Sequence, residues 1–407
     1  MIEHQKDNDI VINKHQKKLI SPIVLFIIIT LSVVVGFVAG IYKYQIVAAI
    51  GPVFGYKSHS GSLDVSSLQQ TYNDLASRFD GKLDSQLLIE GANRGMVAAA
   101  GDDYTVYMSA KEAQEFNDSL SGKIGGIGAE IGLKNNKVTI IRALKDNPAE
   151  KAGLFANDII LSVNDQSTDG WTVDKTVSLI RGEEGTTVKI SVQRGTEIKE
   201  FTITRAILNN PSVESSVTNG IGIITITRFD EKTGELAKLA AQDLKKQSVK
   251  GVILDLRGNG GGTVAAAVDV ASLWLNNKVI LTEKTNNVII NQLKSGTNPI
   301  LAGLPTVVLV NGGTASASEI VAGSLRDNNV AKLVGEKTFG KGSVQQPVDL
   351  DGGALLKVTI ARWFTPNDVN LTKDNSLTPD SIIGLTQADI DKDVDPQLNQ
   401  AKTLLGL

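Results

Sequence analysis

One serine and one lysine are the residues of this sequence best suited to covalent chemistry. Ser316 stands in the run Gly313-Thr314-Ala315-Ser316-Ala317-Ser318-Glu319, and Lys341 follows 25 residues later between two glycines. The three histidines all fall within the first 59 residues, and cysteine is absent. Nucleophilic chemistry in the long C-terminal part must therefore proceed without an imidazole or a thiol. A serine hydroxyl activated by a neutral lysine amine meets that requirement.

The sequence around Ser316 predicts a strand that runs into a helix. Residues 306–310 form a short apolar run, a glycine-containing turn interrupts it, and a helix is expected from Ser316 onward. The first amides of a helix have no partner within the helix and point toward incoming negative charge. The amide of Ala317 is therefore a candidate donor to the oxyanion of a tetrahedral intermediate.

Purely structural interpretations of both residues remain open at this point. Ser316-x-x-Glu319 fits a capping box, in which the serine only caps the helix that follows. Thr314 and Ser318 are neighbouring hydroxyls, so the local motif does not choose Ser316 by itself. Lys341 is equally compatible with a solvated loop, which is the commoner environment of a lysine.

Lys341 must be uncharged near neutral pH to act as a general base. Its pKa then has to fall from about 10.4, which requires burial of the amine. The flanking Gly340 and Gly342 would let the backbone bring this amine against the serine. The segment 335–341 also matches the start of a phosphate-binding P-loop, but Gly342 occupies the position of the magnesium-binding hydroxyl. We therefore do not favour a nucleotide-binding interpretation.

A glycine-rich loop is predicted after the apolar strand 251–255. Asp255-Leu256-Arg257-Gly258-Asn259 leads into three consecutive glycines, whose bare backbone can approach a substrate closely. The amide of Gly261 or Gly262 would supply the second oxyanion donor. The alternative is a strand-to-helix turn without a ligand. The glycine spacing does not satisfy the dinucleotide-binding pattern.

An uncharged apolar run near the N-terminus predicts a membrane anchor. Residues 19–42 consist mostly of Ile, Val, Leu, Phe and Gly, and a bilayer-crossing helix needs roughly 20 such residues. Four lysines fall within residues 1–18, so the positive-inside rule places that tail in the cytoplasm and everything after the linker 43–62 outside. A cleaved signal peptide is the alternative, but its apolar core usually has only about 7–15 residues.

The remaining chain divides by pattern into four further segments. Apolar residues recur at helical spacing in 63–120, which predicts a helical N-terminal region. Residues 121–205 alternate short β-type runs with turns and have about the size of a PDZ domain. Strands alternate with helices over 206–395, as in an α/β core, and 396–407 remain as a C-terminal tail. The predicted fold class is a multidomain protein with α+β and α/β parts.

The composition argues against several functional classes. A chain of 407 residues with 42% hydrophobic residues is long enough for two or three domains. The net charge of −3 gives no electrostatic case for nucleic-acid binding. The lack of cysteine excludes a disulfide scaffold and thiolate metal sites, and the histidines do not form a cluster. We therefore expect neither a metal nor a cofactor.

Together these segments resemble the carboxyl-terminal processing peptidases, the tail-specific serine–lysine proteases that carry a PDZ domain. The resemblance extends over about residues 64–380 and departs at Ser376, where the family often shows glycine, and from Thr386 onward. The matching motifs are Gly91-x3-Gly95-Met96, Gly101-Asp102-Asp103-Tyr104-Thr105, Gly126-Ile127-Gly128-Ala129-Glu130, Asp146-Asn147-Pro148-Ala149, Ala152-Gly153-Leu154, Asp158-Ile159-Ile160, Ile180-Arg181-Gly182, Asp255-Leu256-Arg257 with its glycines, Gly313 to Glu319, and Thr338-Phe339-Gly340-Lys341-Gly342-Ser343-Val344-Gln345.

The resemblance implies a set of catalytic roles. Ser316 would be the nucleophile, Lys341 the general base, and Gln345, four residues further on, the side chain that orients the lysine amine. The alkoxide of Ser316 would attack a peptide carbonyl, and the amide of Ala317 and a glycine of the 260–262 loop would stabilise the oxyanion. Water would then resolve the acyl-enzyme, with the lysine acting in reverse.

The resemblance also implies partners. Residues 121–205 would be a PDZ domain whose loop Gly126-Ile127-Gly128 grips the free C-terminus of a protein or peptide substrate, although an ordinary glycine-rich turn is the alternative. Arg181 would link this domain to the active site, or it is simply an exposed arginine at a helix end. The departures near the C-terminus leave contacts of a homo-oligomer open.

The predicted function is a membrane-anchored, extracytoplasmic serine endopeptidase. It would recognise protein tails through the PDZ domain and cleave with the Ser316–Lys341 pair. The alternative is a catalytically silent PDZ-type peptide-binding protein on a protease-like scaffold. The joint presence of Ser316, Lys341 and Gln345 speaks against that alternative.

Overall fold

The described part of the chain consists of two compact units. The computed structural model describes residues 21–41, 63–122, 125–134, 137–208, 211–386, 388–389, 392 and 394–406. The units are Met1–Asp84 and Ser85–Leu407, and each is described by itself. The predicted cytoplasmic tail 1–18 and the linker 43–62 lie outside the described residues.

The first unit contributes two described helices, α1 (Pro22–Ile41) and α3 (Ser66–Arg78). Helix α1 falls within the apolar run 19–42. Among the described residues, no helix was found to combine the length and apolarity that a membrane crossing requires, so the anchor stays a prediction. Leu68 and Tyr72 of α3 recur at helical spacing, and no residue of this helix is buried.

The second unit begins with two helices and an intervening strand. The helices α4 (Ser85–Ala98) and α5 (Ala110–Leu120) lie within the predicted helical region, and β1 (Val106–Met108) separates them. Ser109 begins α5 with a capping box, because its backbone N–H donates to the carboxylate of Glu112 at 2.7 Å. The sequence did not predict β1, because a strand of three residues is too short to show a detectable alternation.

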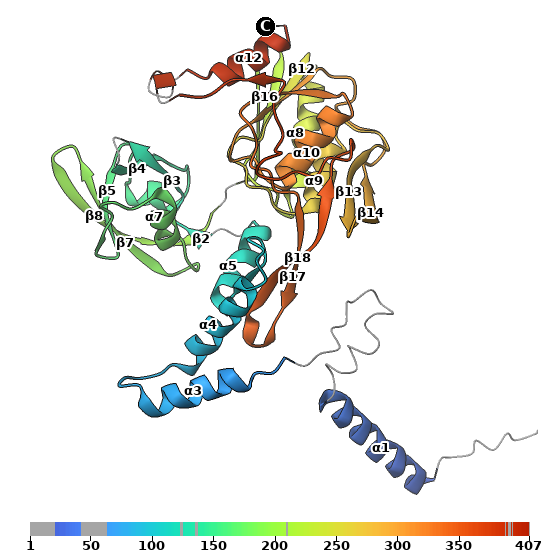
Figure 1. The fold of residues 1–407 in the computed structure, drawn as a ribbon. Helices are drawn as coiled ribbons and strands as arrows, with labels where there is room; N and C mark the ends of the chain where they lie inside the picture. Colours follow the sequence, from blue (N-terminus) through green and yellow to red (C-terminus); the bar gives the residue numbers. More distant parts are fainter. Residues whose placement is uncertain are drawn as a thin grey trace, which may run out of the picture. The chain divides into compact units, whose positions relative to one another are not determined.

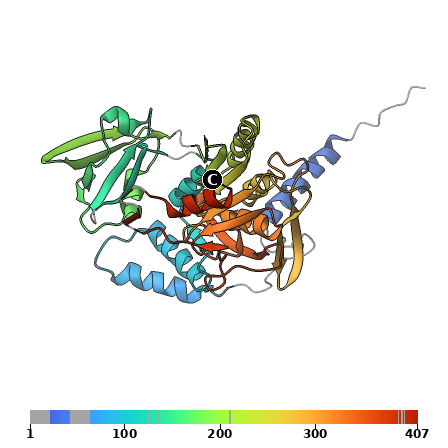
Figure 2. The ribbon, with the colours of Figure 1, turned by 90° about the horizontal axis from the view of Figure 1, so that it is seen from above.

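A small antiparallel β-structure, green in Figures 1 and 2, follows in residues 125–207. Its strands pair in the order β3–β4–β5–β7–β8, with β6 on β5, while β2 pairs with β9. The elements are β2 (Gly125–Gly126), β3 (Ala129–Lys134), β4 (Lys137–Ala143), α6 (Pro148–Ala152), β5 (Ile159–Val163), β6 (Gln166–Ser167), α7 (Val173–Ile180), β7 (Thr187–Arg194), β8 (Glu197–Thr204) and β9 (Ala206–Ile207).

Two arginines stabilise this β-structure from within. Arg194 donates from two nitrogens to the two oxygens of the fully buried Asp158, each at 2.7 Å. Such a bidentate pair satisfies a carboxylate that would otherwise be costly to bury. Arg205 is buried and donates to the carbonyl of Ile180 at 2.8 Å, at the C-terminal end of α7. A cation at this end of a helix offsets the helix dipole and holds α7 in place.

A six-stranded sheet forms the largest core of the second unit. Its order is β10–β11–β12–β15–β16–β19, in which β10 is antiparallel to β11 and every later pair is parallel. The strands are β10 (Val213–Thr218), β11 (Ile221–Ile226), β12 (Gly251–Asp255), β15 (Thr306–Val310), β16 (Ala331–Gly335) and β19 (Ser381–Ile382), and the helices between them are α8 (Thr233–Lys246), α9 (Val264–Ala271) and α10 (Ala317–Asp327).

Alternate residues of these strands are buried on opposite faces of the sheet. Val252 and Leu254 of β12 belong to the cluster that contains the buried residues of α8, α9 and α10. Ile253 between them belongs to a second cluster, which includes Ala401 of α12 (Pro396–Leu404). Both faces are therefore covered, as a parallel sheet requires. Residues 396–407, predicted as a tail, instead supply this covering helix, which is red in Figure 2.

An arginine connects the start of α12 to the glycine-rich loop. Arg257 donates to Asp255 at 2.6 Å and to Asp395, the N-cap of α12, at 2.8 Å. Burial alone would lower the pKa of Arg257, but the two carboxylates raise it above its ordinary value. This network ties the start of the loop after β12 to α12.

A second, antiparallel sheet carries the segment that follows Lys341. Its order is β1–β18–β13–β14, and β17 pairs with β18 along the other edge. The strand β1 pairs with β18 through Val106 and Lys357, so the helical N-terminal region contributes a strand to this sheet. The remaining elements are β13 (Val279–Thr285), β14 (Val288–Lys294), β17 (Ser343–Asp349), the short 3-10 turn Asp351–Gly353 and β18 (Leu355–Phe364).

Candidate active site

Ser316 lies at the turn between β15 and α10 in a strained backbone conformation. Its φ is 55° and its ψ is −116°, which places a residue with a side chain in the left-handed half of backbone space. Conformations of this kind persist only where the surrounding structure enforces them, and they cluster at functional sites. A serine on a sharp turn from strand to helix is also how α/β hydrolases present their nucleophile.

The neighbouring hydroxyls are used to hold the turn together. Thr314 donates to the carbonyl of Leu256 at 2.8 Å, and Ser318 donates to the carbonyl of Asn259 at 2.9 Å. Both residues are fully buried, whereas Ser316 is only partly buried. Of the three hydroxyls that the sequence offered, Ser316 is the one left accessible.

A buried carboxylate joins the serine turn to the lysine loop. Glu319 is fully buried, and its Oε2 accepts from the backbone N–H groups of Ser316 and Lys341, both at 2.9 Å. Its Oε1 accepts from the N–H of Gly340 at 2.7 Å and from the hydroxyl of Thr338 at 2.5 Å. The capping contact to Ser316 is therefore real, and the same side chain also holds the backbone of Lys341.

The glycines beside Lys341 are required by a close approach of backbone. A Cβ at Gly340 would lie 2.0 Å from the carbonyl oxygen of Thr372, and one at Gly342 would lie 2.3 Å from that of Leu371. The lysine loop is thus pressed against residues 371–372. The P-loop interpretation is wrong, because the strand β17 follows Lys341 at the place where a P-loop needs a helix.

The side chain of Lys341 points to Tyr104, whereas its backbone is held near Ser316. The Nζ atom of Lys341 lies 5.2 Å from the centre of the Tyr104 ring. Within the described part of the chain, no hydrogen bond joins this amine to the Ser316 hydroxyl, although both backbones share one carboxylate. The predicted pair is therefore brought together through its backbone and is not paired through its side chains.

The environment of Lys341 favours the neutral amine. Burial lowers the pKa of Lys341, and the nearby charge of Lys357 lowers it further. The carboxylates of Glu319 and Asp102 act in the opposite direction without cancelling the effect. Burial also lowers the pKa of Lys357. A depressed pKa is what a lysine needs in order to accept a proton from a hydroxyl near neutral pH.

Gln345 lies in a strand, so its four-residue spacing from Lys341 does not correspond to one turn of helix. It is the third residue of β17, and its Nε2 donates to the hydroxyl of Ser343 at 2.7 Å and to that of Thr359 at 3.4 Å. Among the described residues, no hydrogen bond joins Gln345 to Lys341. The orienting role that the resemblance implied for Gln345 stays a prediction.

Gly261 lies directly against the serine, as an oxyanion donor should. A Cβ at Gly261 would lie 2.9 Å from the Cβ of Ser316 and 3.0 Å from the amide nitrogen of Ala317, the first residue of α10. In this conformation, however, the N–H of Gly261 donates to the side chain of Asn259 at 2.9 Å. Gly262 is packed closely against Phe229, because a Cβ at Gly262 would lie 2.0 Å from the carbonyl oxygen of Phe229.

The predicted carboxylate-binding loop precedes an edge strand of the β-structure. Gly126 pairs with Ala206, and the side chain of Ile127 is buried. Gly128 adopts a φ of 73° and leads into β3, which pairs only with β4 among the described strands. Arg181 follows α7 with an exposed side chain, for which no partner is found in the described residues.

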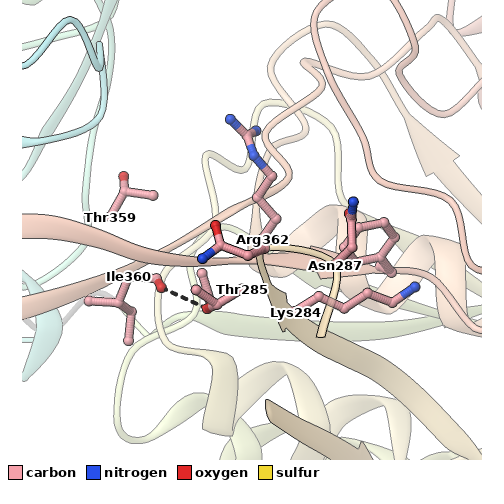
Figure 3. Close-up of a pocket in the computed structure, with 9 residues that line it drawn as sticks. Lys284, Thr285, Asn287, Thr359, Ile360 and Arg362 are labelled. Carbon is pink, nitrogen blue, oxygen red and sulfur yellow. Dashed lines mark hydrogen bonds between the residues drawn. The ribbon is translucent and has the colours of Figure 1, made fainter. Parts of the chain in front are cut away.

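A pocket of about 290 Å³ opens beside β18, but the predicted catalytic residues do not line it. Residues of β18 and residues 284–287 at the end of β13 line this pocket, and Figure 3 shows Ile360 of β18 beside Thr285. The hydroxyl of Thr285, the last residue of β13, donates to the carbonyl of Ile360 at 3.1 Å. Thr359 is the residue that this pocket shares with the hydrogen-bond network of Gln345.

Sequence reasoning missed three residues that shape the site. Glu319 was identified only as a capping partner, since a four-residue motif carries no information about Lys341. Asn259 was quoted without a role, although its side chain also donates to the carbonyl of Ile226 at 2.7 Å and so fixes the glycine loop. Tyr104 belongs to a matching motif, but more than 200 residues separate it from Lys341.

Comparisons with known proteins identify the modules of this chain. Residues 220–383 match the model of peptidase family S41, residues 139–194 match a PDZ domain, and residues 55–112 match the N-terminal domain of the activating protease CtpB. These matches fall on the large core, the small β-structure and the helical N-terminal region, respectively.

The chain is also similar to whole proteins. It is 35% identical over 351 residues to the carboxy-terminal processing protease CtpA of Bacillus subtilis, which covers 84% of this chain and 73% of that protein. It is 36% identical to a probable CtpA-like serine protease of Staphylococcus haemolyticus, over 80% of this chain and 66% of that protein. The solved structure of a photosystem II D1 C-terminal processing protease matches with a TM-score of 0.52 and 29% identity, covering 79% of this chain and 87% of that one.

The fold, the strained serine and these matches define a serine-type peptidase with a PDZ domain. The chain belongs to peptidase family S41, the carboxy-terminal processing peptidases. The resemblance deduced from the sequence is thereby confirmed. The roles of the individual site residues stay predictions.

Replacing Glu319 tests its role in holding the site. In Glu319→Ala, buried N–H groups of Ser316, Gly340 and Lys341 lose their acceptor, and each unsatisfied group costs about 1–3 kcal/mol. We expect the free energy of unfolding in urea to fall by about 3 kcal/mol or more, with faster hydrogen exchange in residues 338–341. Glu319→Gln keeps one acceptor oxygen and should lose less.

Glu235→Ala provides a matched control, because Glu235 is exposed in the first turn of α8 and that variant should change stability by less than about 0.5 kcal/mol. Equal effects of Glu319→Ala and Glu235→Ala would contradict the assigned role of Glu319.

Proposed function

We propose that this chain is a membrane-anchored, extracytoplasmic endopeptidase that binds protein C-termini through its PDZ domain and cleaves with Ser316 and Lys341. The catalytic part of this proposal rests on one observation. The buried carboxylate of Glu319 accepts hydrogen bonds from the backbone amides of both Ser316 and Lys341. Two loops 25 residues apart are thus held together at the two positions that the chemistry needs.

The proposed reaction is acyl transfer. The neutral amine of Lys341 takes the proton of the Ser316 hydroxyl, and the resulting alkoxide attacks the peptide carbonyl. The amides of Ala317 and Gly261 stabilise the oxyanion, and Lys341 returns the proton to the leaving amine. Water then attacks the acyl-enzyme with Lys341 again acting as base, which releases the new carboxylate.

According to this proposal, the described conformation is a resting state of the enzyme. The amine of Lys341 must leave the Tyr104 ring to reach Ser316, and Gln345 must turn from Thr359 to meet it. The N–H of Gly261 must exchange its bond with Asn259 for one with the oxyanion. Each change is a side-chain rotation or a small backbone adjustment, and catalytic hydrogen bonds often tighten only once substrate is bound.

Tail recognition rests on the edge strand β3 and on the loop before it. An extended peptide can pair with the unoccupied edge of β3, and the amides of Gly126, Ile127 and Gly128 at its start are suited to hold a terminal carboxylate. The buried Arg205 supports this arrangement because it fixes the end of α7, which contacts β3.

Anchoring rests on the sequence of the N-terminal segment. The run 19–42 carries no charge, α1 lies within it, and four lysines precede it. Together these features favour a single pass with the N-terminus in the cytoplasm and the peptidase on the other side.

One observation favours a second candidate, a PDZ-type binding protein without peptidase activity. The described site lacks a Ser316–Lys341 hydrogen bond, and the N–H of Gly261 is occupied by Asn259. If this arrangement were permanent, substrate tails would bind without being cut. Family membership and the depressed pKa of Lys341 favour the active enzyme over this candidate.

Removing either member of the pair should abolish cleavage. We expect Ser316→Ala and Lys341→Met each to lower kcat/KM by at least about 1000-fold, because the first variant lacks the nucleophile and the second lacks the base. The measurement is turnover of a fluorogenic peptide with a free C-terminus. Lys332→Met, at an exposed position of β16, serves as the control and should keep full activity. Normal cleavage by Ser316→Ala would refute the assignment.

Blocking the substrate's terminal carboxylate should weaken binding. Loss of a charge-assisted contact is worth roughly 1.5–3 kcal/mol, so an amidated peptide should bind about 10–100-fold more weakly than the free acid. Calorimetric titration of both peptides into the inactive Ser316→Ala protein measures this ratio. Equal dissociation constants would show that the terminal carboxylate is not recognised.

The proposed anchor determines whether the protein is found in the membrane fraction or in the soluble fraction. The full chain should remain with membranes after an alkaline carbonate wash, whereas a variant lacking residues 1–42 should be released, since the apolar run is then gone. Immunoblotting of the two fractions provides the measurement. Release of the full chain by the wash would argue against an integral anchor.

A further inference from the structure

The loop 101–105 connects α4 to β1 and is fixed to the sheet that carries the catalytic segment. The hydroxyl of Thr105 accepts from the backbone N–H of Thr359 on β18 at 3.1 Å. The same hydroxyl donates to the carboxylate of Asp102 at 2.5 Å. The loop therefore has a defined position relative to β18, in addition to the pairing of β1 with that strand.

This loop presents an aromatic ring to the amine of Lys341. The distance of 5.2 Å from Nζ to the centre of the Tyr104 ring is within the roughly 6 Å over which a cation is attracted to a ring face. Tyr104 and Lys341 are both partly buried, so this contact is partly shielded from solvent. A ring attracts the ammonium form and offers little to the neutral amine, so it distinguishes the two protonation states of Lys341.

Three charged side chains from different segments act on the amine. Lys357 on β18 disfavours the ammonium, while Glu319 on α10 and Asp102 in the loop favour it. Together with burial, these charges lower the pKa of Lys341.

The loop is also linked to the predicted orienting residue, Gln345, through Thr359. Gln345 donates to the hydroxyl of Thr359, and the backbone N–H of Thr359 donates to Thr105. The amine of Lys341 thus contacts the loop 101–105 through Tyr104, and the amide of Gln345 is linked to the same loop through Thr359. Among the residues described, neither group is hydrogen-bonded to Ser316.

We propose that Tyr104 is a positioning residue for Lys341, whose ring holds the charged amine away from Ser316 until the amine loses its proton. On deprotonation the attraction to the ring is lost, and the neutral amine is free to accept a hydrogen bond from the serine. Protonation would return it to the ring. This inference rests on the proposed role of Lys341 as the base.

Two substitutions separate the ring from the bulk of the side chain. Tyr104→Leu removes the ring but keeps an apolar cover, and Tyr104→Phe keeps the ring without the hydroxyl. Each is combined with Ser316→Ala for NMR titration of the Lys341 side chain, which does not depend on activity. Each is also placed in the otherwise unmodified chain for the pH profile of kcat/KM on a fluorogenic peptide.

Loss of the ring destabilises the ammonium and should therefore lower the pKa of Lys341. We expect Tyr104→Leu to move the titration midpoint and the acid limb of the profile to lower pH by roughly half a unit. On the acid limb, kcat/KM should then rise about threefold, since half a unit corresponds to that factor. Tyr104→Phe should match the unmodified chain in both measurements.

A midpoint unchanged or raised in Tyr104→Leu would overturn the proposal, because the ring would then act only as a cover that excludes water. The same holds if Tyr104→Phe behaves like Tyr104→Leu. If the midpoint falls as expected but neither the unmodified chain nor any variant cleaves peptide, the positioning role stands and the proposed peptidase function fails. Thermal unfolding of each variant identifies any loss of fold.

Discussion

The site depends on one fully buried carboxylate. A charge buried in a protein is tolerated only when donors surround it, and the side chain of Glu319 receives three backbone N–H groups and one hydroxyl. Because these donors come from the serine turn and from the lysine loop, the two segments cannot separate without exposing or stranding the charge. The carboxylate that caps the start of α10 therefore also connects the two segments that position Ser316 and Lys341.

Backbone and side chains of the site are organised independently. The backbone positions of Ser316, Lys341 and Gly261 are fixed by hydrogen bonds and by close packing in which a Cβ would clash. The side chains of Lys341 and Gln345 are engaged elsewhere, at Tyr104 and Thr359. Since rotating a side chain is far less costly than rebuilding a loop, such a scaffold can be inactive at rest and still be prepared for catalysis. The same separation explains how a strained serine persists before substrate arrives.

Much of the fold was accessible from the sequence, because long elements leave a periodic pattern. The β-rich character of 121–205 appears in the structure as a small β-structure, and the α/β alternation of 206–395 appears as two further sheets with helices. The short strand β1 and the covering role of α12 were not accessible. Three residues show no period, and a mixed helix near the end of a chain does not reveal which face of a sheet it covers.

The sequence alone determined the chemistry that was available: no imidazole or thiol in the large core, one serine at a strand-to-helix turn, one lysine between glycines, and motifs of peptidase family S41. These are properties of residue types and of short spacings, which a linear chain displays directly. Only the tertiary structure decided which hydroxyl is accessible, that Glu319 bridges two loops, and that Tyr104 receives the amine of Lys341. Those facts depend on contacts between residues far apart in the chain, and such contacts exist only once the strands have paired and the charge of Glu319 has been buried.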